Sequence, residues 1–149
     1  MRSKTPSGQK ILAVDDDPKR RSAFEGLLSE NGYGIAGAIP FGDLTPERVD
    51  AQQTDVIVIN APAPNDYSLE TICELQIISP RPIALFCGQG SQEQISSAVT
   101  AGISAYMTVE LSSNQIGPAI ALAVAQFSES QSLRKKLDKA QTALSERKM

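Results

Sequence analysis

The sequence contains no histidine, and only two of its 149 residues are cysteine. The absence of histidine excludes Ser-His-Asp and Cys-His catalysis, together with every metal centre that depends on imidazole ligands. Cys73 and Cys87 do not form a Cys-x-x-Cys pair, so their spacing indicates neither a zinc site nor a redox dithiol. We expect both cysteines to be reduced, buried side chains, which is typical of a cytoplasmic protein.

Long apolar runs are also missing from the sequence. No segment is long and apolar enough to span a bilayer, and residues 1–9 lack the apolar stretch of a signal peptide. We therefore expect a soluble cytoplasmic protein without a membrane partner. We expect residues 1–9 to be a disordered N-terminus.

Positive charge is scarce in most of the chain. Residues 1–127 carry 8 Lys and Arg against 14 Asp and Glu, whereas residues 128–149 carry 6 against 3. An acidic body is not typical of a nucleic-acid-binding surface, and the tail has no aromatic residues that could stack on bases. We therefore expect no RNA binding by this segment alone.

A short apolar stretch near the N-terminus, Lys10–Val14, stops abruptly at three aspartates and a proline. A continuous run of this length is typical of a strand buried on both faces of a parallel α/β sheet. Asp17 is a candidate N-cap, and Pro18 is a candidate first residue of the following helix. Asp15 and Asp16 would then lie at the carboxyl edge of the sheet, where open α/β sheets bind their ligands.

The same pattern of an apolar strand followed by a helix recurs five times along the chain. The predicted strands cover residues 10–14, 33–39, 55–60, 83–87 and 104–108. Each is followed by residues with helical periodicity. Five such units predict a doubly wound α/β fold in which one parallel sheet is covered by helices on both faces.

The last predicted helix is longer than the domain needs. Apolar residues from Ile116 to Phe127 can close the core, but helix-forming sequence continues to Lys148. A single helix over residues 114–147 would be roughly 50 Å long at ~1.5 Å per residue. Its far end has nothing in its own domain to pack on.

The far end of this helix carries a coiled-coil repeat. The repeat consists of Leu133, Leu137, Ala140 and Leu144, at spacings of 4, 3 and 4 residues. We expect residues 128–149 to form a coiled coil that pairs with a second copy of the chain. A solvated helix, or a hinge to a further domain, is the alternative.

Three segments carry a resemblance to a known family. They are Ile-Leu-Ala-Val-Asp-Asp-Asp-Pro at 11–18, Asp-Val-Ile-Val-Ile-Asn at 55–60 and Ala-Gly-Ile-Ser-Ala-Tyr at 101–106. Over residues 10–127 the sequence resembles a response-regulator receiver domain. The resemblance implies the flavodoxin-like receiver fold with strand order 2-1-3-4-5, and a role in signal transduction rather than an enzyme activity.

Three segments near the end of the chain point to one class of receiver-containing regulators. Ala-Ile-Ala-Leu-Ala-Val-Ala-Gln-Phe at 119–127, Leu-Arg-Lys-Lys-Leu at 133–137 and Ala-Leu-Ser-Glu-Arg-Lys at 143–148 are similar to the AmiR/NasT class of antitermination regulators. In that class such a helix leads into a three-helix RNA-binding module called ANTAR. The resemblance therefore implies that RNA is bound only through an effector module that is not present in this chain.

The positions that carry phosphoryl chemistry in receivers are changed here. In receivers an aspartate at the end of the third strand attacks a phosphoryl group, and acids of the first strand hold Mg²⁺. The resemblance places Asn60 at the phosphoacceptor position, Cys87 where Ser or Thr is usual, and Val109 where Lys is usual. It also matches Tyr106 to the aromatic residue that reorients on phosphorylation, with ordinary packing as the alternative.

The remaining acids suit a weakened magnesium site at this edge of the sheet. Its candidate ligands are Asp15, Asp16 and the side-chain carbonyl of Asn60. In the other interpretation the two acids are solvated beside a capped helix, and Asn60 is hydrogen-bonded within its own loop. No cofactor is required in either case. We interpret the basic run at residues 19–21 as a solvated helix face.

These features predict a degenerate, phosphorylation-independent receiver that dimerises, responds to a regulatory protein such as a sensor, and controls an ANTAR module. One alternative is a receiver of a two-component phosphorelay that is phosphorylated at an unusual acceptor, namely Asp15, Asp16 or Asp66. A more remote alternative is a small magnesium-dependent α/β phosphohydrolase. The last has little support, because the sequence shows no nucleophile beside the acidic pair.

Overall fold

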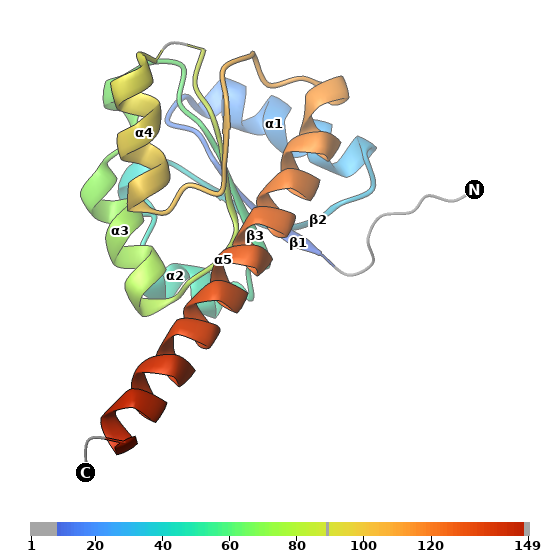
Figure 1. Cartoon of the computed structure of the whole chain (residues 1–149). Helices are drawn as coiled ribbons and strands as arrows, with labels where there is room; N and C mark the ends of the chain where they lie inside the picture. The colour runs from blue at the N-terminus through green and yellow to red at the C-terminus, as the bar shows by residue number, and fades with distance from the viewer. Residues whose placement is uncertain (1–8, 89, 148–149) are drawn as a thin grey trace.

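The computed structural model describes residues 9–88 and 90–147 (Figure 1). Five strands form one all-parallel sheet in the order β2-β1-β3-β4-β5. They are β1 (Lys10–Val14), β2 (Gly34–Ile39), β3 (Val56–Asn60), β4 (Ile83–Phe86) and β5 (Ala105–Met107). The predicted fold class and strand order are confirmed.

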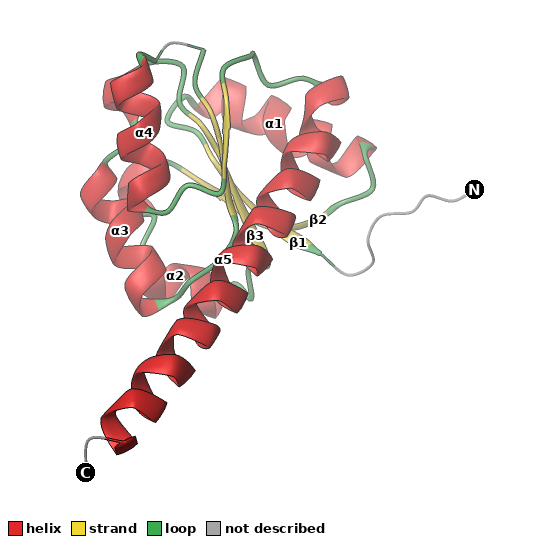
Figure 2. Ribbon diagram, in the orientation of Figure 1, coloured by secondary structure: helices red, strands yellow, loops and turns green. Residues whose placement is uncertain are grey.

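Helices cover both faces of this sheet (Figures 1 and 2). The helices are α1 (Pro18–Glu30), α2 (Pro46–Ala51), α3 (Leu69–Ile78), α4 (Gln92–Ala101) and α5 (Ser113–Arg147), with short 3-10 turns η1 (Phe41–Asp43) and η2 (Pro64–Asp66). Helices α1 and α5 pack on one face, whereas α2, α3 and α4 pack on the other. The three central strands β1, β3 and β4 are thereby almost completely buried, which is why they are continuously apolar.

Strand β1 shows how the sequence builds the core. Ile11 and Ala13 belong to the apolar cluster under α1 and α5, whereas Leu12 and Val14 belong to the cluster under α2, α3 and α4. All four side chains are completely buried. Because successive side chains of a strand point to opposite faces, a continuous apolar run supplies both layers at once.

Helix α5 is a single helix of 35 residues, and its second half leaves the domain (Figure 1). Ile116 and Ile120 are buried against the sheet, whereas the side chains beyond Phe127 are largely exposed. Pro118 lies inside the helix, where it has no N–H to donate to the backbone oxygen of Asn114 four residues earlier.

Two predictions fall wholly or partly outside the described residues. The predicted disordered N-terminus covers residues 1–9, of which only Gln9 is described, and the end of the predicted helix at Lys148 also lies outside. Within the described part of the chain, no helix combines the length and the apolarity needed to cross a membrane.

Candidate functional site

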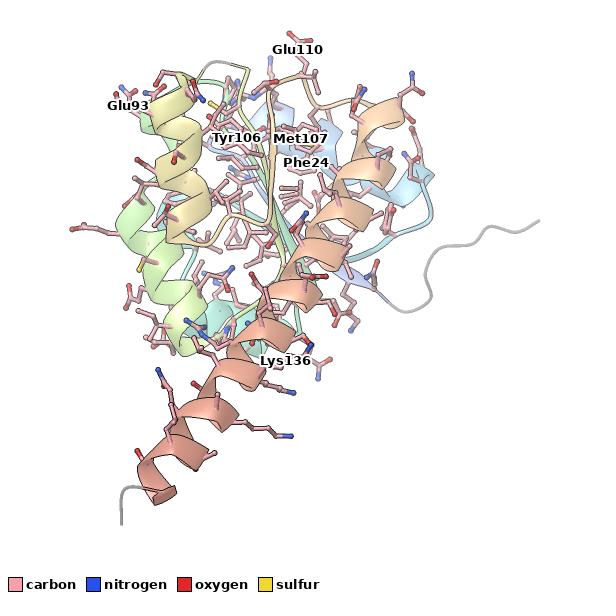
Figure 3. All side chains as sticks on the ribbon, in the orientation of Figure 1. Phe24, Glu93, Tyr106, Met107, Glu110 and Lys136 are labelled. Atoms are coloured by element: carbon pink, nitrogen blue, oxygen red, sulfur yellow. The ribbon has the colours of Figure 1, made fainter. Side chains whose placement is uncertain are left out.

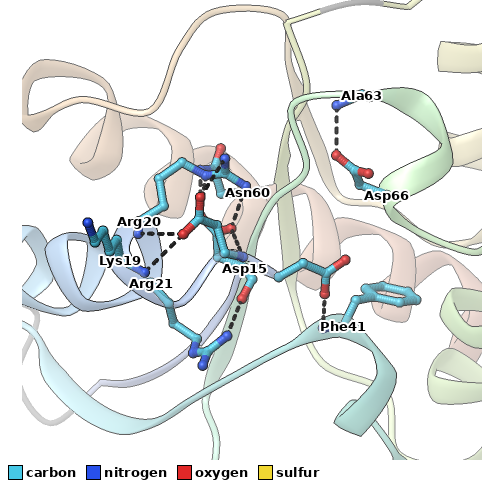
Figure 4. Close-up of polar contacts among 10 residues, drawn as sticks. Asp15, Lys19, Arg20, Arg21, Phe41, Asn60, Ala63 and Asp66 are labelled. Atoms are coloured by element: carbon cyan, nitrogen blue, oxygen red, sulfur yellow. Dashed lines mark hydrogen bonds and ion pairs between the residues drawn. The ribbon is translucent and has the colours of Figure 1, made fainter.

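The candidate site lies at the carboxyl edge of the sheet, where β1 and β3 end side by side. Asp15 directly follows β1, and Asn60 is the last residue of β3 (Figure 4). The sequence predicts that these two side chains meet, and the structure places the Asn60 Nδ2 atom 2.8 Å from Asp15 Oδ2. The amide nitrogen donates this hydrogen bond, so Asn60 contacts Asp15 with its donor group rather than with its carbonyl.

The Asp15 carboxylate is fully buried and accepts four hydrogen bonds. Besides Asn60, it accepts one from the Asp17 backbone N–H at 3.0 Å. Arg20 donates the other two, from Nη2 to Oδ1 at 2.7 Å and from Nε to Oδ2 at 3.1 Å. Four donors fill the acceptor positions of a carboxylate, and the two-pronged guanidinium contact is its strongest partner.

Helix α1 brings Arg20 to the site. The Asp17 side chain caps the helix by accepting from the Lys19 and Arg20 backbone N–H groups, and Pro18 is the first helical residue. The predicted cap is therefore confirmed. Because the helix starts directly at the end of β1, its third residue reaches back over Asp15.

The charges around Arg20 favour its protonated form. Hydrogen bonding to Asp15 raises the pKa of the Arg20 guanidinium, and Asp17 lies 3.5 Å from Nη1. Arg21 also contacts the site, because its Nη1 donates to the Asp15 backbone oxygen at 2.8 Å. The interpretation of residues 19–21 as a solvated helix face is therefore wrong for Arg20 and Arg21, because Arg20 pairs with the buried Asp15 carboxylate and Arg21 bonds the backbone oxygen of the same residue.

Asp16 contacts the backbone of η1. It is exposed, and its Oδ1 accepts from the Phe41 backbone N–H at 2.8 Å, at the start of η1 (Figure 4). The expectation that both acids are solvated is thus wrong for Asp15, which is buried. The expectation that the Asn60 side chain is hydrogen-bonded within its own loop is also wrong, because its amide N–H donates to Asp15.

The donor set does not fit a magnesium ion in this conformation. Asp15 is saturated by hydrogen-bond donors, Asn60 presents N–H groups, and Asp16 is turned to the backbone of η1. Within residues 9–88 and 90–147, no group of three or more acidic, histidine or cysteine side chains could hold a metal ion. Magnesium binding by this chain stays a prediction.

Two further positions named by the resemblance lie at the same edge of the sheet. Cys87 follows β4 and is completely buried, and Val109 follows β5 and is exposed. Arg20, Asn60 and Val109 share the wall of a hollow of about 760 Å³ beside the site, together with Phe24 and Phe86.

Tyr106 packs on the side of the sheet covered by α2, α3 and α4, where it is half-buried. Burial raises the pKa of Tyr106, and its hydrogen bonds with Cys87 and Tyr67 raise it further. Its hydroxyl lies so close to Gly90 that a Cβ atom there would come within 2.5 Å of it. These contacts are those of a packed side chain, and whether the ring reorients stays a prediction.

The remaining predicted residues lie away from this edge. Cys73 is exposed on α3, so the expectation that both cysteines are buried is wrong for Cys73, which lies on the outer side of its helix. The residues predicted for dimerisation, Leu133, Leu137, Ala140 and Leu144, are all exposed on the far half of α5. Figure 3 shows the side chains of that half, near Lys136, standing clear of the domain.

The sheet order β2-β1-β3-β4-β5, with helices on both faces, is the fold of solved receiver (CheY-like) domains. A CheY-like receiver domain protein from Methanospirillum hungatei superposes with a TM-score of 0.61 at 18% identity, covering 82% of this chain and 98% of that one. A fusion carrying a trimeric coiled coil of yeast Spc42 gives 0.63 at 16% identity, covering 98% and 100%.

Among sequences, the chain is similar to the transcriptional regulatory protein PdtaR of Mycobacterium tuberculosis. The two are 25% identical over 121 residues, which is 81% of this chain and 59% of PdtaR. The chain thus spans somewhat more than half the length of this curated relative. No family model matches the sequence.

Proposed function

We propose that this chain is a receiver domain whose signalling state does not depend on phosphorylation. The observation that carries the proposal is Asn60, which ends β3 and donates its amide N–H to Asp15 at 2.8 Å. An amide has no anionic oxygen to attack phosphorus, so an acyl phosphate cannot form at this position. The resemblance adds that Cys87 and Val109 lack the hydroxyl and the cation that would hold a phosphoryl group.

A receiver of this kind takes its input from a protein and not from a phosphoryl group. A regulatory partner such as a sensor shifts the equilibrium between two states if it binds one of them more tightly. Pairing of two chains through the far half of α5 provides such an equilibrium. This half exposes Leu133, Leu137 and Leu144, each more than half accessible to solvent, at the spacing of a coiled coil.

The output of the domain, in our proposal, is control of an RNA-binding antitermination module of the ANTAR type. The similarity of the tail to AmiR/NasT regulators supports it, and PdtaR is itself described as a transcriptional regulatory protein. In this proposal α5 connects the receiver to that module, and the receiver itself does not contact RNA. The domain acts as a regulator and not as an enzyme.

Phosphoryl transfer provides the test. The chain is incubated with acetyl phosphate and millimolar Mg²⁺, and its intact mass is measured; a receiver with an intact phosphoacceptor aspartate controls for the activity of the donor. We expect no phosphoryl adduct on this chain. A stoichiometric adduct would contradict the proposal, and its loss in Asp16→Asn or Asp66→Asn would favour the alternative of an unusual acceptor.

A further inference from the structure

The Asp15 carboxyl group needs compensating hydrogen-bond donors or positive charge, because it is completely enclosed. Its side chain has 0% of its surface exposed. A buried carboxylate without a partner is strongly destabilising, and it either binds a cation or becomes protonated. In receivers that use phosphate, that cation is a magnesium ion held between acids of the first and third strands.

Arg20 already satisfies this need from within the chain. Its guanidinium contacts both carboxylate oxygens of Asp15, at 2.7 and 3.1 Å, while 44% of its own side chain remains exposed. The charge therefore reaches the buried acid from the solvent side. A magnesium ion needs oxygen ligands at about 2.0–2.1 Å, so it cannot share this carboxylate face with the guanidinium.

The two other candidate ligands are arranged consistently with a guanidinium and not with a metal ion. Asn60 donates an N–H to the same oxygen that Arg20 Nε contacts, whereas a metal ligand must present a lone pair. Asp16 accepts a hydrogen bond from the Phe41 backbone N–H, and the part of the chain that the structure describes holds no group of three or more acidic or cysteine side chains that could bind a metal ion.

We propose that Arg20 is the resident cation of this receiver, occupying in the folded protein the position that Mg²⁺ takes in receivers that are phosphorylated. The charge of the pocket is then fixed by the fold and is independent of the magnesium concentration. Signals therefore have to enter through other surfaces of the domain. This inference deepens the proposed function, on which it rests for the idea that no phosphoryl group has to be bound.

The test is a magnesium titration of the full chain carrying Arg20→Met, which keeps an apolar stem of similar length but removes the charge. Lys19→Met is the matched control, because it removes the same charge from the same turn, and among the ion pairs of the described residues none involves Lys19. MgCl2 is the probe, with binding followed by calorimetry and thermal unfolding followed with and without the salt.

We expect the wild type and Lys19→Met to show no saturable binding of millimolar Mg²⁺ and no change in midpoint temperature. Arg20→Met unfolds several degrees lower without salt, and it binds Mg²⁺ at least about tenfold more tightly than the wild type. Millimolar Mg²⁺ then restores part of the lost stability, because the ion binds only the folded state.

Saturable Mg²⁺ binding by the wild type with the affinity of Arg20→Met would overturn the inference, as would an Arg20→Met variant that is as stable as the wild type and does not respond to Mg²⁺. If Arg20→Met does not fold, the double variant Arg20→Met/Asp15→Asn decides. If the double variant folds and does not bind Mg²⁺, the result supports the pairing of Arg20 with Asp15. If the double variant does not fold either, the inference is overturned. None of these outcomes involves phosphoryl transfer, so the inference can fail while the proposed function stands.

Discussion

The two halves of α5 have the same secondary structure but different surroundings. In the first half, Ile116 and Ile120 are at most 1% exposed against the sheet, whereas in the second half Leu133 and Leu137 are 58% and 60% exposed. Intrinsic helix propensity accounts for the continuity of the helix, since the second half is rich in Leu, Lys, Ala and Gln. The stability of a helix in a protein comes mainly from the packing of its apolar face, and within one chain only the first half of α5 packs against the sheet.

The difference in exposure shows that the second half of α5 lacks a packing partner within its own chain. A regularly spaced apolar stripe that stays exposed is unfavourable, and a second copy of the same stripe would bury it. The first half therefore belongs to the folding of the domain, and the second half is proposed to belong to association. Substitutions in each half are expected to affect different measurements.

Removal of residues 130–149 has the largest expected effect on association. It deletes three leucines per chain, and burial of each leucine side chain in a dimer contributes about 1.5–3 kcal/mol. We expect the intact chain to sediment as a dimer and the shortened chain as a monomer at the same concentration. If both sediment as monomers, the coiled-coil role is contradicted.

The fold could be predicted from the sequence because buried parallel strands leave a direct trace in it. The continuous apolar runs before Asp15 and Asn60 marked β1 and β3 with ends accurate to one residue. The other strands were predicted to the same accuracy: residues 104–108 were predicted, for example, and β5 covers Ala105–Met107. The strand order came from the resemblance, since periodicity does not specify which strands are neighbours.

The candidate site was predicted only in part. The resemblance implied that Asp15 and Asn60 lie together, but the partner Arg20 was missed. Three consecutive basic residues on a helix do not show which of their side chains contacts a buried acid. A signal was present, however: an arginine at the third position of a helix that begins at the strand end lies within reach of the acid five residues before it.

Truncation of one buried side chain in the first half of α5 has the next largest expected effect. Ile120→Ala removes a side chain that is 1% exposed, and we expect it to lower the free energy of unfolding by about 3 kcal/mol. Leu137→Ala, measured at a concentration where the chain is monomeric, should change it by less than about 0.5 kcal/mol. Urea unfolding followed by circular dichroism measures both, and equal losses would show that the second half packs within its own chain.

Glycine substitutions at exposed alanines provide the finest comparison of the two halves. Ala125 and Ala143 are both exposed, so neither change removes a packing contact. In a helix interior Gly is less favourable than Ala by about 1 kcal/mol.

Because the turn around Ala125 unfolds together with the domain, we expect Ala125→Gly to lower the free energy of unfolding of the domain by about this amount. Ala143→Gly should leave that free energy unchanged in the monomer and reduce only the helical signal, because its turn has no contact through which the cost could reach the sheet. An equal effect of the two substitutions would mean that α5 unfolds as one cooperative unit, and the division of the helix into a folding half and an association half would have to be abandoned.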